Sequence, residues 1–284
     1  KTILSGVRPQ ELELLKMLLE HNEVSIEEFQ EDVSEEFGYL LDMDAIQNTI
    51  RILQGHFHIN SAEHQKYAQI DILKVNENKR IQRLNSFVRK LNESEFRKEL
   101  NDIISFGLHR YKDKYNQNKN QGVPFVLYEQ YSRRDVCFLM NCEKDLSSVM
   151  YGMKRIKDDV FIFVTYHKKQ TKDISKKYVD GKPDYADAFE DDLIFSWDTQ
   201  LGKGVNSSYS KNVITAPRKH LMIQKRDSQI KFYYLGQFDI LEVKPAKKLN
   251  QKGEEQDIAK FRVKMRNPVR EDIWQYFLSN VDEE

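Results

Sequence analysis

Apolar residues recur at helical spacing through the first part of the chain. Apolar residues, mostly leucines, recur at helical spacing from Pro9 to about residue 19. Because proline is suited to the first turn of a helix, this segment is predicted to be helical. Ser25 and Glu28 have the spacing of a capping box and predict a second short helix. Apolar positions in residues 44–53 predict a third. Three short helices in succession indicate a helix-turn-helix core.

A β-hairpin is predicted after the third helix. Residues 56–59 and 67–75 carry β-type patterns separated by turn residues, so residues 1–75 are predicted to form a winged-helix-like fold. From residue 77 to 115 the apolar positions keep a helical period through two more helices. We interpret these helices as an arm that couples the first part of the chain to the second.

A polar linker divides the chain. Residues 116–122 contain no β-branched side chain and end shortly before Pro124, which is typical of a domain boundary. We therefore predict a helical, winged-helix-like coupler over residues 1–118 and a second domain over residues 119–284.

Short β-type runs dominate the second domain. They are separated by Gly, Pro, Asn and Asp, with few helices between them; one helix is predicted to start at Ser132 and a terminal one over residues 272–278. The runs are residues 160–166, 193–197, 220–224, 230–235, 238–243 and 260–265. This spacing predicts a closed or nearly closed β-barrel and an α+β protein overall.

Charge is unevenly distributed in a chain of zero net charge. Forty-five basic residues balance 45 acidic ones, but residues 201–226 contain six basic residues and no acidic one. Residues 1–44 have three basic and twelve acidic residues, a net charge of −9, which argues against a phosphate backbone lying on the first helices. The basic stripe is therefore the predicted contact for a polyanion.

The remaining composition restricts the class of protein. Cys137 and Cys142 are the only cysteines and no Cys/His cluster has zinc-site spacing, which favours a reducing cytoplasm. No apolar run is long enough to span a membrane, so no membrane partner is expected. Because the sequence begins at Lys1, we expect it to be a segment of a longer protein.

Catalytic motifs are weak or missing. No phosphate-binding loop occurs, so any ATP site should lie outside this segment. Glu242 and Lys244 could form half of a divalent-metal nuclease site, although a charged surface strand explains the tripeptide better. We expect neither a catalytic residue nor a cofactor or metal in this segment, and the nuclease remains an alternative.

One stretch combines aromatic and polar side chains directly before the basic stripe. Aromatic walls and hydrogen-bonding groups are what a pocket for an extruded base requires, while Phe195 and Trp197 could equally be core residues on one strand face. The predicted pocket comprises Tyr166, Tyr185, Asp187, Phe195, Trp197, Asp198 and Gln200. The predicted contacts to the DNA backbone are Arg133, Arg134, Lys168, Lys169, Lys203, Lys211, Arg218 and Lys219.

An ordered series of motifs resembles a known family. The motifs are residues 131–136, 160–168, 185–187, 195–200, 220–226 and 232–236, with a looser match at residues 8–15. The series resembles the domain that follows the helicase core in many bacterial superfamily-two proteins, and most closely the C-terminal part of SauUSI-type restriction endonucleases.

The resemblance implies the target-recognition part of an ATP-dependent type IV restriction endonuclease. Such an enzyme would carry its nuclease and translocase elsewhere and require ATP and Mg²⁺, while this part, similar to SRA/PUA-like barrels, would bind duplex DNA and flip 5-methylcytosine or 5-hydroxymethylcytosine. The expected partners are that DNA, the helicase and nuclease domains of the same chain, and a second copy in a homodimer. The alternative from another class is a protein-interaction or dimerisation module.

Overall fold

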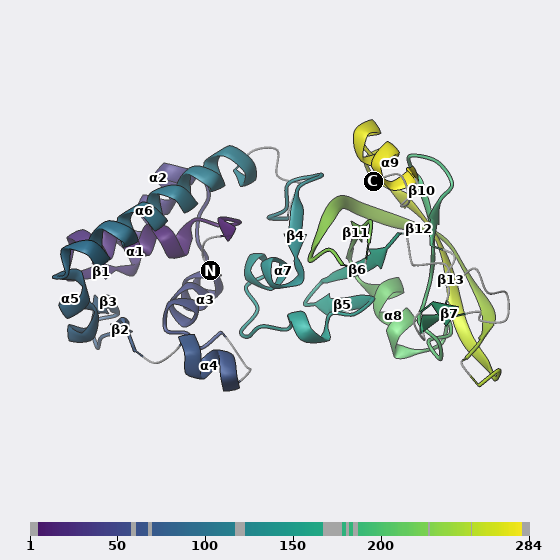
Figure 1. Ribbon diagram of the computed structural model, residues 1–284, viewed down its shortest axis with the longest axis horizontal. Helices are drawn as coiled ribbons and strands as arrows, with labels where there is room; N and C mark the ends of the chain where they lie inside the picture. The colour runs from purple at the N-terminus through teal and green to yellow at the C-terminus, as the bar shows by residue number, and fades with distance from the viewer. Residues whose placement is uncertain are drawn as a thin grey trace. The chain divides into compact units, whose positions relative to one another are not determined.

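The computed structural model is a mixed α+β protein of two compact units (Figure 1). It describes residues 5–57, 61–67, 70–116, 123–166, 178–179, 182–183, 187–226, 228–250 and 252–279. Unit 1 comprises Lys1–Val126 and Arg133–Ser147, and unit 2 comprises Leu127–Ser132 and Ser148–Glu284. The predicted boundary near residue 118 stays a prediction, and the chain enters unit 2 at residue 127 before α7 returns to unit 1.

Unit 1 is predominantly helical. Its helices are α1 (Gln10–Glu20), α2 (Ile26–Phe37), α3 (Met43–Leu53), α4 (Ser61–Tyr67), α5 (Asn85–Leu91), α6 (Ser94–Arg110) and α7 (Arg133–Leu139), with a π-helical turn at Tyr111–Tyr115. Strands β1 (Glu23–Ser25), β2 (Leu73–Val75) and β3 (Arg80–Arg83) form an antiparallel sheet in the order β1-β3-β2. The three predicted N-terminal helices and the capping box of Ser25 and Glu28 are confirmed.

The hairpin of unit 1 lies further along the chain than predicted. Residues 54–57 form a turn and residues 61–67 form α4, while residues 58–60 and 68–69 are outside the described residues. Strand β2 lies at the end of the predicted segment 67–75, and its partner is β3 instead of the segment that begins at residue 56. Asn76 makes the difference, because its side-chain oxygen accepts hydrogen bonds from the backbone N–H groups of Asn78 and Arg80 and closes the turn. Ile81, which keeps a helical period in the sequence, is consequently a buried strand residue.

Unit 2 is built on one large sheet. Its strands are β4 (Gln130–Ser132), β5 (Met153–Ile156), β6 (Asp159–Thr165), β9 (Ala188–Phe189), β10 (Ile194–Asp198), β11 (Arg218–Gln224), β12 (Lys231–Leu249) and β13 (Glu255–Met265), and β7 (Tyr178–Val179) pairs with β8 (Lys182–Pro183). The order is β5-β6-β11-β12-β13-β10-β9, with β4 on β12. A 3₁₀ turn at Ser147–Val149 and helices α8 (Ser208–Thr215) and α9 (Glu271–Leu278) complete the unit.

The hydrophobic core of unit 2 lies against this sheet. Strand β6 pairs in parallel with β11 and is buried along most of its length, while the other pairs are antiparallel. Core residues from β6, β10, β13 and α9 include Ile162, Phe195, Phe261 and Phe277. Among the described strands β5 and β9 each have one neighbour, so closure into a barrel stays a prediction.

Strand β12 is continuous where the sequence predicts two strands. Gly236 has a φ of +98° and the register with β11 shifts at Leu221/Met222, so this glycine bends the strand instead of ending it. A second register shift, between Ile240 and Glu242, leaves Leu241 exposed.

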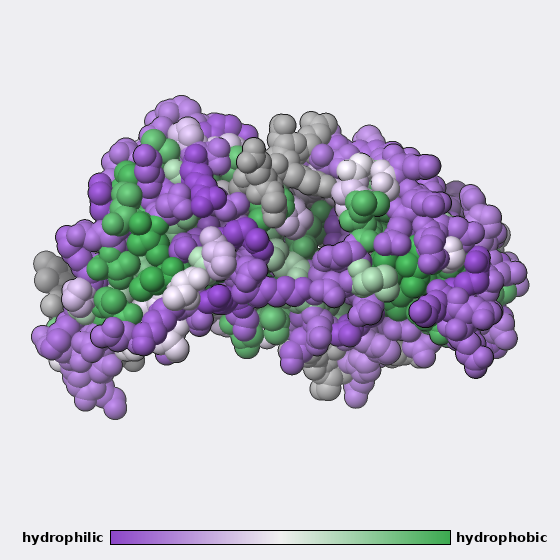
Figure 2. Space-filling model, turned by 180° about the vertical axis from the view of Figure 1, so that it is seen from behind, coloured by the Kyte–Doolittle hydropathy of each residue, from purple (hydrophilic) through white to green (hydrophobic). Residues whose placement is uncertain are grey.

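The end of β12 and the beginning of β13 form a two-stranded ribbon. Within the described residues, residues 244–249 pair only with β13, and the tip of the ribbon has a hydrophilic surface (Figure 2). No helix in the described part of the chain is long and apolar enough to cross a membrane.

Candidate nucleic-acid interface

A fixed loop connects β10 to α8. The Thr199 hydroxyl accepts a hydrogen bond from the Ala259 backbone N–H at 2.8 Å and donates one to the Lys203 carbonyl at 2.7 Å. The Thr199 N–H also donates to the Ala259 carbonyl at 2.9 Å, and Lys203 forms a β-bridge with Ile258. The loop backbone is therefore held against β13, and the side chains that follow β10 have defined positions.

Two polar side chains of this region converge over Gly152. A Cβ atom at this glycine would lie 2.7 Å from Gln200 Nε2 and 2.8 Å from the Tyr209 hydroxyl oxygen, and its φ is +72°. Gln200 also donates to the Tyr151 carbonyl at 3.4 Å. The Tyr209 ring lies 6.2 Å from that of Trp197. The left-handed φ favours glycine here, and the amide and the phenol lie close to its Cα, with the Trp197 ring beside Tyr209.

The predicted acidic residues lie next to this loop but are already engaged. The Asp198 carboxylate is 5% exposed and forms an ion pair with Lys248, whose Nζ is 2.9 Å from its Oδ2. Asp187 accepts a hydrogen bond from the Asp198 backbone N–H at 3.0 Å. Lys248 thus neutralises Asp198 and anchors β10 to the ribbon, while Asp187 serves as an acceptor for the β10 backbone.

Lys203 and Lys211 supply unneutralised positive charge. Lys203 lies in the fixed loop and Lys211 on α8, and both are exposed. No carboxylate in the described part of the chain lies within ion-pair distance of either ammonium group. Cations without a protein partner are the ones that can replace counterions on a phosphate backbone.

Arg218, in contrast, is bound to a buried carboxylate. Its Nε and Nη2 donate to the two Asp159 oxygens at 2.7 Å each. Asp159 also accepts from His220 Nε2 at 2.8 Å, and His220 Nδ1 lies 3.0 Å from the Tyr234 hydroxyl. This network fixes the start of β11 against β6. Within it, the Asp159 carboxylate neutralises the charge of Arg218.

The electrostatics of this network follow from its burial. Burial alone would raise the pKa of Asp159, but hydrogen bonds from Arg218 and His220 outweigh it and lower the pKa to about 2. Burial lowers the pKa of His220, against the opposing effect of Asp159. His220 is therefore neutral at pH 7, donating from Nε2 and accepting at Nδ1.

Two further cations of the basic stripe, Lys219 and Lys225, are held by groups of the protein. Lys219 donates to the Ala216 carbonyl at 2.6 Å. Lys225 is fully buried, donates to Ser279 at 2.8 Å and lies 4.5 Å from the centre of the Tyr276 ring. The stripe of six basic residues in the sequence is therefore not a continuous basic surface.

The predicted pocket aromatics pack in the core. Phe195 is fully buried and Trp197 is 4% exposed, both within the cluster between the sheet and its helices. The Tyr166 ring contacts those of Phe189 and Phe277, with centroids 5.8 Å and 5.6 Å away. These positions match the core interpretation of the two strand aromatics, and a pocket role stays a prediction.

Other predicted residues belong to unit 1 or are outside the described residues. Arg133 and Arg134 begin α7 in unit 1, where Arg134 forms an ion pair with Asp145 at 2.6 Å. Tyr185, Lys168 and Lys169 are outside the described residues. The structure thus brings together Asp187, Asp198, Gln200 and Lys203 among the predicted positions.

Sequence reasoning missed Gly152, Tyr209 and Lys248. Lys248 reaches Asp198 only because β12 and β10 both flank β13, and no local pattern announces that pairing. Tyr209 stands within the basic stripe, so its ring was a usable signal. Gly152 follows the exposed Tyr151 and carries no motif.

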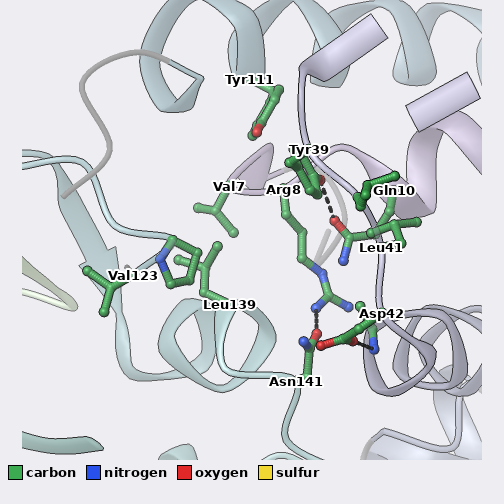
Figure 3. A pocket seen from close by; sticks show the side chains of 13 residues that line it. Val7, Arg8, Gln10, Tyr39, Leu41, Asp42, Tyr111, Val123, Leu139 and Asn141 are labelled. Atoms are coloured by element: carbon green, nitrogen blue, oxygen red, sulfur yellow. Dashed lines mark hydrogen bonds between the residues drawn. The ribbon is translucent and has the colours of Figure 1, made fainter. Parts of the chain in front are cut away.

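Unit 1 contains a separate open cavity of about 570 Å³ (Figure 3). All three nitrogens of the Arg8 guanidinium that lines it donate to protein groups, among them Asn48 and Asn141. The Tyr39 hydroxyl donates to Gln10 at 2.9 Å. Arg8 and Tyr39, which line this cavity, thus form hydrogen bonds to other groups of unit 1. In the described part of the chain, no group of three or more His, Cys, Asp or Glu side chains could hold a metal ion.

Two known protein families match the chain, one in each half. Residues 125–277 match a domain of unknown function, DUF3427. The chain belongs to the DUF3427 family. Residues 1–116 match a second domain of unknown function, DUF8090, and no curated protein matches the chain.

Solved structures similar to this DUF3427 chain are distant. The sulfur-binding and SRA domains of ScoMcrA with phosphorothioated DNA are 10% identical over 99% of this chain and 90% of that one, with a TM-score of 0.31. MspJI restriction endonuclease with an oligonucleotide is 8% identical over 40% and 31%, with a TM-score of 0.27. Arabidopsis thaliana SUVH6 is 12% identical over 63% and 35%, with a TM-score of 0.33. The chain spans about a third of the last two, and at these scores none carries an argument about function.

Proposed function

We propose that this DUF3427 chain binds duplex DNA through the loop between β10 and α8 and recognises a modified cytosine there. The observation that carries the proposal is the convergence of Gln200 and Tyr209 over Gly152, beside the unneutralised Lys203. An amide both donates and accepts hydrogen bonds and can therefore read the Watson–Crick edge of a flipped base. Lys203 and Lys211 would hold the phosphates on either side.

The modified bases are 5-methylcytosine and 5-hydroxymethylcytosine, flipped out of the duplex into an SRA/PUA-like barrel. Burying a methyl group is worth on the order of 1 kcal/mol, so contact with the 5-substituent alone would discriminate about tenfold or less. Greater selectivity would come from hydrogen bonds of Gln200, because a polar group left unpaired in a closed site costs more than a lost apolar contact.

Unit 1 is the proposed winged-helix-like coupler. The element order α1-β1-α2-α3-α4-β2-β3, in which α4 is an additional short helix before the hairpin, and the strand order β1-β3-β2 support this assignment. Helix α3, which would read DNA in such a fold, is engaged by protein: Asn48 donates to the Cys142 carbonyl, and Arg51 donates to the Glu143 carbonyl at 3.1 Å. A coupling role fits these contacts better than DNA binding by α3.

The parent protein would be a cytoplasmic, ATP-dependent type IV restriction endonuclease of the SauUSI type. Its helicase and nuclease domains would use ATP and Mg²⁺, while this chain supplies target recognition without a catalytic residue of its own. A homodimer would place two recognition sites on one DNA molecule.

The test separates base recognition from backbone binding. We expect Gln200→Ala to reduce the ratio of affinities for modified and unmodified duplexes. Lys203→Ala should weaken binding to both about equally, because a phosphate contact carries no base information. Fluorescence anisotropy with matched duplexes measures both effects. A Gln200→Ala variant that keeps the full ratio would contradict base recognition at this loop.

A further inference from the structure

A cation contributes most to phosphate binding when no carboxylate of the protein already neutralises its charge. Arg218, in the basic stripe, donates both of its forked N–H groups to the buried Asp159. An arginine held in this way releases few counterions when DNA approaches. An unneutralised cation that reaches the C-terminal end of α8 from another element is therefore a better candidate for a phosphate contact than Arg218.

Arg155 on β5 meets this requirement. Its Nη1 donates to the Thr215 hydroxyl at 3.0 Å and its Nε donates to the Lys157 carbonyl at 3.1 Å. Both partners are neutral, and no carboxylate in the described part of the chain forms an ion pair with this guanidinium. The side chain is thus held at the end of α8 with its full charge.

Lys211 lies one helical turn from this contact. Thr215 donates its hydroxyl proton to the Lys211 carbonyl at 2.8 Å, so the two residues share one face of α8. Four residues of helix rise about 6 Å, which is comparable with the axial distance covered by about two phosphates of one DNA strand. The ammonium of Lys211 and the guanidinium of Arg155 can therefore address neighbouring phosphates.

We propose that Arg155 and Lys211 form a phosphate-binding pair along α8. In this pair Arg155 makes a backbone contact of the kind that the sequence predicts for Arg218. The partner is the sugar–phosphate backbone of duplex DNA. This inference rests on the proposed DNA binding of unit 2 and specifies the path of the DNA backbone from Lys203 along the helix.

Salt titration of Arg155→Ala tests the pair. Loss of one phosphate contact should lower the slope of log affinity against log salt by about 0.9, and affinity at 0.1 M salt should fall roughly five- to tenfold, equally for modified and unmodified duplexes. Arg155→Lys keeps the charge and should retain most of the slope. Arg270→Ala is the matched control, because Arg270 is an exposed arginine already paired with Asp272 at 2.6 Å.

The outcomes separate the two proposals. If Lys203→Ala lowers the slope while Arg155→Ala leaves it unchanged, the phosphate pair is wrong and the proposed DNA binding stands. If the unsubstituted chain shows no salt-dependent binding, the proposed function fails and the pair fails with it. Thermal melting by circular dichroism confirms that each variant is folded, as expected for a partly exposed side chain.

Discussion

At the residue scale, the buried Asp159 links Arg218 and His220 in unit 2. It is 1% exposed and accepts hydrogen bonds from Arg218 and His220, while the Phe161 ring stacks on His220 with centroids 4.6 Å apart. A buried carboxylate is tolerated only when its partners compensate for lost hydration. The network therefore makes the stability of unit 2 sensitive to acid.

Stability of unit 2 is expected to fall as the pH is lowered from 6.5. The pKa of His220 is lowered in the folded chain, so its contribution is fully present above the unfolded value near 6.5 and is lost below it. Asp159, with a pKa of about 2, contributes about 2 to 3 kcal/mol that is lost between pH 4 and pH 2. Chemical denaturation at several pH values measures both ranges.

Asp159→Asn isolates the carboxylate. We expect this variant to be less stable at pH 7 and to lose the part of the acid dependence below pH 4. Asp272→Asn, which alters an exposed carboxylate paired with Arg270, is the control and should keep the acid dependence. An Asp159→Asn variant with unchanged stability would show that the charge of Asp159 does not stabilise unit 2.

The sequence indicates residue types at this scale, but it does not indicate their partners. The basic stripe was visible, yet Arg218 is neutralised by a residue 59 positions earlier, and Lys225 is buried against α9. Strand pairing brings Arg218 to Asp159, and packing of α9 on the sheet brings Lys225 to Ser279. The local positions of Asp198, Gln200 and Lys203 were predictable, because they follow one strand directly.

At the element scale, helix α2 shows how local chemistry sets a boundary. Ser25 accepts from the Glu28 N–H at 3.0 Å, and Glu28 accepts from the Ser25 N–H at 2.6 Å, so the helix begins where the sequence predicts. Strand β12 is the opposite case, because Gly236 is a turn signal in the sequence and a bend within a strand in the fold. Tertiary pairing decided between the two meanings of that glycine.

Ser25→Ala should destabilise unit 1 by about 1 kcal/mol, because the Glu28 backbone N–H at the start of α2 loses its side-chain acceptor. Ser94→Ala, at the exposed first residue of α6 with no capping hydrogen bond, should change stability by less than about 0.5 kcal/mol. Urea denaturation measures both. Equal effects of the two substitutions would mean that the cap does not stabilise the helix.

At the scale of the whole molecule, the chain is interleaved between its units. Strand β4 belongs to unit 2, and α7 directly after it belongs to unit 1, where Phe138 stacks on Phe57 with centroids 4.6 Å apart. A boundary placed in the polar linker could not anticipate this return. The α+β class and most helices can be predicted from the periodicity of apolar residues. The return of α7 to unit 1 cannot, because it depends on contacts between distant parts of the chain.

Binding of the chain to three matched duplexes tests the central claim most directly. The duplexes carry cytosine, 5-methylcytosine or 5-hydroxymethylcytosine, and fluorescence anisotropy is measured at two fixed salt concentrations. The account predicts binding that weakens with salt and is tighter for a modified duplex. Equal or absent binding would contradict it and would favour a protein-interaction module that couples or dimerises the parent protein.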